Sequence, residues 1–200
     1  MTALRKTPVA LTSDAAPFAI RAERSSDVVA REALLDACFG ANRHSRTCQR
    51  LRDGRAPAEG LALSAIVRGR LVGTVRLWHV SVGRVPALML GPLAVEADCR
   101  KFGVGAALME RAIVLAKQRG HGAVILLGDA AYYARFGFSG VKTGELTLPG
   151  PFERDRLLSL ELRDGALDGV WGMVSATGRP EPRSRAVRAR KALLPVPRAA

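Results

Sequence analysis

The chain has 200 residues, of which 48% are hydrophobic, and it carries a formal net charge of +13. This composition suits one folded domain and excludes a disordered chain, and no apolar run approaches the roughly 18 residues that a membrane span needs. Cys38, Cys48 and Cys99 show no metal-ligand spacing, so we expect reduced thiols and no metal. Arg5 and Lys6 precede only a short, broken apolar stretch, which does not form a signal peptide, so the expected location is the cytoplasm.

The N-terminal half predicts strands around one main helix. Residues 1–16 contain no periodic segment, and we expect a flexible N-terminal segment there. Residues 25–27 are good helix caps, and Gly40 is placed to end the helix that follows them. Residues 68–70 read as a hairpin turn between two branched, apolar runs. The elements expected are strands at 18–23, 61–67, 71–80 and 88–95, and helices at 28–39 and 45–51.

The C-terminal half alternates helices and strands. Gly120 and Gly137 are placed to end two of the helices. Expected here are helices at 103–119 and 130–136, strands at 124–127, 144–148 and 157–162, and a small hairpin within 164–178. Strands first, then alternating helices and strands, indicate one α/β domain over 17–176 with a sheet of mixed direction.

Residues 177–200 form a basic Pro/Arg/Ala-rich segment that we expect to be a disordered tail. From Arg179 onward there are six Arg and one Lys against one Glu. Such a charge attracts polyanions, so nucleic acid is one candidate partner. The segment has no aromatic residue to stack on bases, and a solvated tail is therefore the favoured interpretation.

Residues 88–112 combine a strand, a turn with closely spaced glycines and a helix, which together form a general anion site. Free backbone N–H groups and the positive end of the helix dipole point at the ligand, and glycine lets a phosphate come close. A Walker loop is excluded because Ala106 and Ala107 follow Gly105, where Lys and Ser or Thr are needed. A dinucleotide fingerprint is disfavoured because Leu108 stands at the third glycine position.

The remaining candidate is coenzyme A, and here the sequence resembles a known family. Arg100-Lys101-Phe102-Gly103-Val104-Gly105 is similar to the Arg/Gln-x-x-Gly-x-Gly/Ala motif of the GNAT superfamily of N-acetyltransferases. The stretches LGPLAV, GDAAYYARFGF and LPGPFERDRLLSLEL resemble the YhbS-like branch of predicted acetyltransferases, and the resemblance covers roughly residues 18–175. It implies a mixed, splayed central β-sheet of about six to seven strands flanked by about four helices.

The resemblance also implies where acetyl-CoA would bind. The sheet of this family opens beside its fourth strand, and the pantetheine arm lies in the gap. Pro92 lacks an N–H and Gly91 permits a bulge, which suits such an opening. The cofactor-binding residues implied are Leu93, Ala94, Val95, Arg100, Lys101, Phe102, Gly103, Val104 and Gly105.

For catalysis, the resemblance implies that Tyr133 is the acid that protonates the leaving thiolate. Adjacent residues do not share a helix face, so we expect Tyr132 to point elsewhere. Residues 87–95 contain no carboxylate, and His79 is the candidate general base, with a water chain to solvent as the alternative. We expect Asp129 to cap the following helix.

The predicted function is therefore transfer of an acetyl group from acetyl-CoA to a primary amine by direct attack in a ternary complex. A non-catalytic acyl-CoA-binding module and a nucleic-acid-associated protein are the alternatives. Arg43, His44 and Arg46 lie in the region that forms the acceptor wall in this superfamily and would favour an acidic acceptor. Small amines, amino acids, antibiotics and protein amines all stay open as acceptors, as do a monomer and a homodimer.

Overall fold

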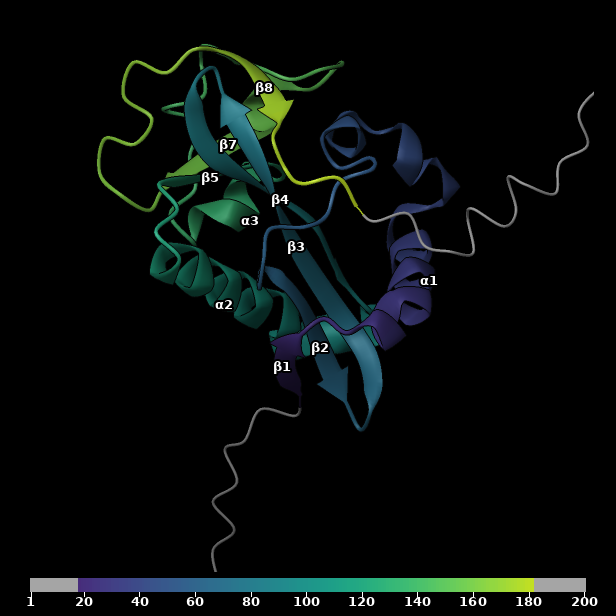
Figure 1. Cartoon of the computed structure of the whole chain (residues 1–200). Helices are drawn as coiled ribbons and strands as arrows, with labels where there is room; N and C mark the ends of the chain where they lie inside the picture. The colour runs from purple at the N-terminus through teal and green to yellow at the C-terminus, as the bar shows by residue number, and fades with distance from the viewer. Residues whose placement is uncertain (1–17, 182–200) are drawn as a thin grey trace, which may run out of the picture.

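Figure 1 shows the computed structural model, which describes residues 18–181. The expected flexible segment at 1–16 and the part of the expected tail beyond Glu181 lie outside the described residues. Among the residues described, no helix is both long enough and apolar enough to cross a bilayer.

One mixed sheet of eight strands forms the centre of the domain, in the order β1-β2-β3-β4-β5-β7, with β8 paired to β3 and β6 paired to β8. The strands are β1 (Ala19–Ala22), β2 (Ala62–Val67), β3 (Arg70–Val82), β4 (Val85–Val95), β5 (Ala123–Leu127), β6 (Leu146–Thr147), β7 (Leu157–Glu161) and β8 (Gly172–Ala176). The pairs β4–β5 and β6–β8 are parallel, and the others are antiparallel. The mixed α/β fold is thus confirmed, with more strands than expected. The expected hairpin within 164–178 is wrong, because β8 pairs with β3 and β6 instead.

Within residues 18–181 there are three α-helices, α1 (Val28–Phe39), α2 (Val104–Gln118) and α3 (Ala130–Ala134). Five short 3-10 segments accompany them: η1 (Ser25–Asp27), η2 (Ala41–Ser45), η3 (Thr47–Leu51), η4 (Ala97–Phe102) and η5 (Arg154–Arg156). The helix expected at 45–51 is absent as an α-helix, because Arg46 has extended backbone (φ −67°, ψ 145°) and separates η2 from η3.

The two longer helices cover opposite faces of the sheet, with α3 on the same side as α2 (Figure 1). Five residues of α2 are fully buried against the sheet: Val104, Leu108, Met109, Ala112 and Ala116. Gly73 of β3 lies beneath them, where a Cβ would meet Val104 and Leu108 at 3.0 Å. On the other face, Leu34 and Leu35 of α1 pack on Leu71 and Ala94. Burial of one apolar stripe per helix therefore fixes both helices to the sheet.

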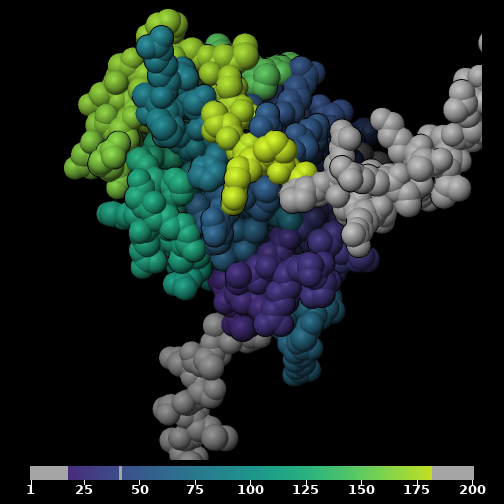
Figure 2. Space-filling view, viewed as in Figure 1, coloured from purple at the N-terminus to yellow at the C-terminus, as the bar shows by residue number. Residues whose placement is uncertain are grey.

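The C-terminal end of the described chain is bonded to the segment that follows η3. The Ala56 N–H donates to the Arg179 carbonyl at 2.9 Å, and the Arg55 guanidinium donates to the Gly178 carbonyl at 2.7 Å. Figure 2 shows this yellow end of the chain on the molecular surface beside the blue residues of that segment. Residues 177–181 therefore form part of the domain surface.

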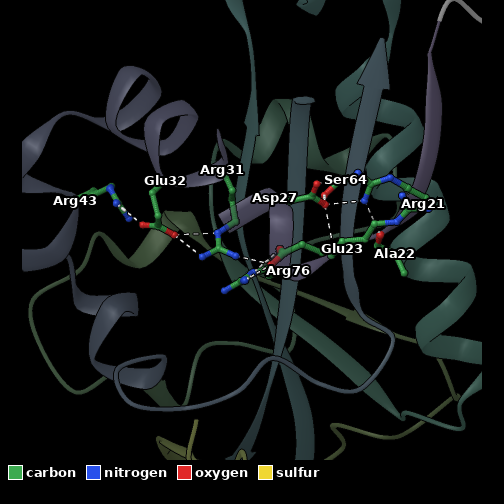
Figure 3. A network of polar contacts seen from close by, with 10 residues as sticks. Arg21, Ala22, Glu23, Asp27, Arg31, Glu32, Arg43, Ser64 and Arg76 are labelled. Carbon is green, nitrogen blue, oxygen red and sulfur yellow. Dashed lines mark hydrogen bonds and ion pairs between the residues drawn. The ribbon is translucent and has the colours of Figure 1, made fainter. Parts of the chain in front are cut away.

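A network of buried charges ties α1 to the sheet (Figure 3). Glu23, whose side chain is 8% exposed, accepts hydrogen bonds from Arg31 of α1 and from Arg76 of β3. Asp27 accepts two from Arg21 of β1, at 2.6 and 2.8 Å, and one from Ser64 of β2 at 3.1 Å. These carboxylates are satisfied on several sides, as buried charges require.

We expect Asp27→Asn to lower the free energy of unfolding by about 2 kcal/mol at neutral pH, because it weakens charge-assisted hydrogen bonds. The Arg21 guanidinium holds the pKa of Asp27 well below its usual range, which outweighs the opposing effect of burial. A depressed folded-state pKa gives stability that is present above the unfolded pKa, near 4, and is lost as pH falls below it. The deficit of the variant should therefore shrink between about pH 5 and pH 2 in urea titrations followed by circular dichroism. Asp164→Asn, at an exposed position, is the matched control, and a deficit independent of pH would contradict this account.

Candidate functional site

The sheet opens between β4 and β5, the only parallel pair of long strands among the described residues. These strands pair at just two positions, Leu88 with Val124 and Met89 with Ile125. Beyond Met89, β4 continues for six residues with no strand on its β5 side within the described chain. The side of β4 over residues 90–95 is therefore an open backbone edge inside the protein.

A bulge sits where the opening begins. Val75 pairs with Leu93 and Leu77 pairs with Leu90, so that Gly91 and Pro92 face one residue of β3. Gly91 has φ 129°, which favours glycine, and its carbonyl accepts a hydrogen bond from the Trp78 indole. The bulge thus lies just beyond the last residue of β4 that pairs with β5, at the pair of residues where the family resemblance implied an opening.

The ladder beyond the bulge turns specific backbone groups toward the opening. The Glu96 N–H donates to the Val72 carbonyl at 2.9 Å, which makes this a hydrogen-bonded pair. Because such pairs alternate along an antiparallel ladder, the backbone N–H and C=O of Leu93 and Val95 point away from β3. The Val95 carbonyl already accepts from the Arg100 Nε at 3.2 Å. The Leu93 backbone groups and the Val95 N–H are left facing the opening.

Two adjoining hollows occupy the opening. The larger, of about 960 Å³, is lined by residues of α1, η2, η3, β4, α3 and the segment 151–156. The smaller, of about 360 Å³, is lined by the end of β4, the start of α2 and part of α3. Both are lined by Phe39, Leu93, Arg100 and Tyr132. These volumes fall in the range of small-molecule and cofactor sites.

The smaller hollow lies at the N-terminus of α2. Gly103 adopts a left-handed conformation (φ 74°) directly before the helix, and its carbonyl accepts the Ala107 N–H at 3.0 Å. The N–H groups of the first helical residues, from Val104 to Ala106, have no partner within the helix. At Gly105 a Cβ would lie 3.1 Å from the Tyr132 hydroxyl, so any side chain at this position would narrow the hollow. The helix start can therefore receive an anion.

Six of the nine residues expected to bind the cofactor line the smaller hollow: Leu93, Ala94, Val95, Arg100, Gly103 and Gly105. Lys101, Phe102 and Val104 do not. Phe102 is exposed, with the Lys101 ammonium 5.2 Å from its ring centre, and the Val104 side chain is fully buried under α2. Only the backbone of Val104 is therefore available at this hollow.

The two tyrosines of α3 lie at the junction of the hollows. Tyr133 lines the larger hollow and packs edge-on against Phe138 and Tyr132. Tyr132 lines both hollows, with the Arg135 guanidinium 4.7 Å from its ring centre. The expectation that Tyr132 points away from the site is wrong, because α3 lies along the opening and presents two neighbouring positions to it.

Burial keeps the phenols protonated. It raises the pKa of Tyr133 to about 12, and the neighbouring Tyr132 and Asp129 add to this while Arg156 opposes it. Burial also raises the pKa of Tyr132. Tyr133 is therefore a neutral hydrogen-bond donor at the wall of the larger hollow.

His79, the candidate general base, and the carboxylates near the opening lie in different places. Asp129 caps α3, as expected, and accepts the Tyr132 N–H at 2.9 Å. His79 lines neither hollow and lies beside His121, with the ring centres 5.4 Å apart. Asp129 and Glu153 are the carboxylates that line the larger hollow. Within residues 18–181, no cluster of three or more His, Cys, Asp or Glu side chains is arranged to hold a metal ion.

Comparison with known proteins gives a consistent result. Residues 29–138 match the model of the acetyltransferase (GNAT) family. A protein of Escherichia coli K12 called uncharacterized N-acetyltransferase YhbS is 30% identical over 157 residues, which cover 78% of this chain and 93% of the relative.

Two solved structures share the fold. The crystal structure of Escherichia coli YhbS in complex with CoA has a TM-score of 0.71 and 30% identity, covering 82% of this chain and 92% of that chain. A GNAT acetyltransferase of Brucella melitensis in complex with acetyl-CoA has a TM-score of 0.57 and 21% identity, covering 84% and 93%.

The pKa of Tyr133 can be measured because the chain has only two tyrosines. In a Tyr132→Phe variant, we expect the remaining phenol to ionise well above its ordinary value of about 10, since burial disfavours the phenolate. Absorbance at 295 nm would follow the titration, with the same variant in concentrated urea as the control that ionises near 10. Titration near pH 10 in the folded variant would show that the phenol is solvated.

Proposed function

This chain belongs to the acetyltransferase (GNAT) family and is YhbS-like, and we propose that it transfers an acetyl group from acetyl-CoA to a primary amine within a ternary complex. One observation carries the proposal. The open backbone edge of β4 and the glycine turn before α2 both border one pair of adjoining hollows.

The residues at the smaller hollow suit coenzyme A. The outward Leu93 carbonyl and Val95 N–H can pair with the amides of a pantetheine arm, as a substitute strand would. The N–H groups at the start of α2, with Gly103 and Gly105 giving close access, suit a pyrophosphate. Arg100 adds a positive charge at the junction of the hollows. The relative whose structure contains CoA supports the same assignment.

The reaction forms one C–N bond and breaks one C–S bond, and the proton that the amine loses is balanced by the one that the thiolate gains. The Leu93 N–H faces the opening and would stabilise the oxyanion of the tetrahedral intermediate. Tyr133 would donate its proton toward the sulfur and recover one from the amine nitrogen. Because its pKa, about 12, lies above that of a thiol, the phenol acts as a hydrogen-bond donor and proton relay and does not stay ionised.

Acetyl-CoA binding is the first test. We expect saturable binding of acetyl-CoA in calorimetric titrations, and no binding of NADH, which the glycine spacing does not fit. Gly105→Val should weaken acetyl-CoA binding roughly tenfold or more, equivalent to about 1.4 kcal/mol, because the added side chain fills the hollow. Gly144→Ala is the control, since a Cβ there meets nothing within 4 Å. Absence of acetyl-CoA binding by the folded wild type would reject the proposal.

The role of Tyr133 is tested by Tyr133→Phe. We expect kcat to fall by about 100-fold or more, the usual contribution of general acid catalysis, with unchanged affinity for acetyl-CoA. Tyr132→Phe is the matched control and should lower kcat far less, because its hydroxyl lies toward Gly105. Thiol release measured across pH gives the rates. Equal turnover of wild type and Tyr133→Phe at every pH would remove Tyr133 from the chemistry.

The same measurements separate the enzyme from a binding module. Saturable binding of acetyl-CoA with no thiol release over a broad panel of amines would favour a protein that binds the acyl-CoA without transferring the acyl group.

A further inference from the structure

The larger hollow is rich in arginine. Five arginines line this hollow, Arg43, Arg46, Arg52, Arg100 and Arg156, against two carboxylates, Asp129 and Glu153. A site that needed only to hold a neutral amine would gain nothing from this excess of positive charge. The ion pairs and hydrogen bonds of each arginine show which of these charges have no carboxylate partner.

Two of the five arginines are paired with carboxylates. Arg43 is paired with Asp36 at 2.6 Å and with Glu32 at 2.5 Å. Arg156 lies 3.6 Å from Glu153. Arg100 donates to the Val95 carbonyl at 3.2 Å and also lines the smaller hollow, so its charge lies at the cofactor end.

Arg46 and Arg52 differ from Arg43 and Arg156 in their partners. Within residues 18–181, neither guanidinium forms an ion pair with a carboxylate. Arg52 is half-buried and uses its Nε to donate to the Cys48 carbonyl at 3.0 Å. Arg46 lies over the Phe39 ring, 5.1 Å from its centre, and reaches the Phe39 carbonyl at 3.5 Å. Since a guanidinium has five N–H donors, most donors of both side chains are unused.

The groups around Arg52 do not neutralise it. Asp53 is the adjacent carboxylate, but it is exposed and accepts a hydrogen bond from Gln49 at 2.6 Å. Burial raises the pKa of the Cys48 thiol, so the thiol stays uncharged. Burial lowers the pKa of Arg52, and the charges of Arg43 and Arg46 lower it further against the opposing effects of Cys48 and Asp53. An anion in the hollow would offset this cost.

These two arginines are separate from the cofactor end. Neither Arg46 nor Arg52 lines the smaller hollow, where the glycine turn lies. Both come from the η3 region, which borders only the larger hollow. Both side chains therefore lie at the larger hollow, outside the cofactor end.

We propose that the acceptor is a small primary amine that also carries a carboxylate or phosphate group, and that Arg46 and Arg52 bind this anion. The inference rests on the proposed function, since it assigns the acceptor of that reaction. Planar guanidinium groups recognise carboxylate and phosphate oxygens through paired hydrogen bonds, and they would leave the amine end directed toward Leu93 and Tyr133.

The wall that carries these arginines favours a small acceptor. The Thr47 hydroxyl donates to the Pro151 carbonyl, and the Arg50 guanidinium donates to the Pro149 carbonyl at 2.7 Å. These bonds fix the 149–152 segment against η3, so the two sides of the wall are joined. This joined wall holds the segment that carries both anion-binding side chains in place.

The test uses pairs of amines that differ in the anion: β-alanine with 3-aminopropanamide, and O-phosphoethanolamine with ethanolamine. We expect kcat/KM for the better anionic amine to exceed that of its neutral mate at least tenfold. Arg52→Gln and Arg46→Gln should each reduce kcat/KM for the anionic amine roughly 10- to 100-fold, mainly through KM, and leave the neutral amine unchanged. The better of the two anionic amines distinguishes carboxylate from phosphate.

Arg111→Gln, on the exposed side of α2, is the matched control for loss of one positive charge. Circular dichroism and acetyl-CoA affinity of each variant show that the fold and the cofactor end are intact. Acetylation of both members of each pair at equal rates, or rates unaffected by both substitutions, would overturn the inference while the proposed function stands.

Calorimetric titration of the amines into CoA-saturated protein keeps the two proposals separable if no amine is acetylated. Binding of an anionic amine that Arg52→Gln abolishes would then support the anion site without the reaction. Absence of any preference for the anionic amines in binding would overturn it.

Discussion

The parting of β4 from β5 after Met89 is the constraint on which the rest of the site depends. A fully paired sheet would consume every backbone donor and acceptor of residues 90–95, and no ligand could enter its plane. The bulge at Gly91 and Pro92 ends the parallel pairing after two positions and keeps the antiparallel pairing with β3. One irregularity thus converts a structural strand into a strand with one structural edge and one binding edge.

An opened sheet needs support on both faces, and different interactions supply it on each face. On the α2 face, close packing supports the opening, with five fully buried side chains above Gly73. On the α1 face, burial of Leu34 and Leu35 is supplemented by the charges of Glu23, Arg31 and Arg76 (Figure 3). This network continues along α1 through Glu32 to Arg43, at the wall of the larger hollow. The charges that anchor α1 therefore also fix one side of the candidate acceptor site.

Local chemistry explains which parts of the fold were predictable from sequence. The turn at 68–70 was predictable because Gly69 stands between two branched, apolar runs, and in the structure Gly69 takes the positive φ (81°) that a tight hairpin favours. The start of β4 at Val85, three residues before the expected strand, was not predictable, because Pro86 argues against a strand. Its partner, Ser81, belongs to a pair that makes no hydrogen bonds, so the missing N–H costs the β3 ladder nothing.

The features of the candidate site also divide into those that were predictable from the sequence and those that were not. The bulge, the glycine turn and the cap at Asp129 are local features with recognisable residues. Arg52 has no ion pair because no neighbouring segment of the described chain places a carboxylate against it. The position of Tyr132 depends on the path of α3 along the opening. Neither property is encoded in a local pattern, so neither was predictable from the sequence.

The charges and the phenol also constrain one another. Arginine side chains near Tyr133 would lower its pKa and favour the phenolate, which cannot donate a proton. Burial is the larger effect, and the pKa rises to about 12 although Arg156 opposes the shift. The two unpaired guanidinium groups come from the η3 region, while the phenol is carried by α3, and a bound anion would reduce their field further. An anionic acceptor would therefore supply binding energy at one end of the hollow and help to keep the proton donor neutral at the other.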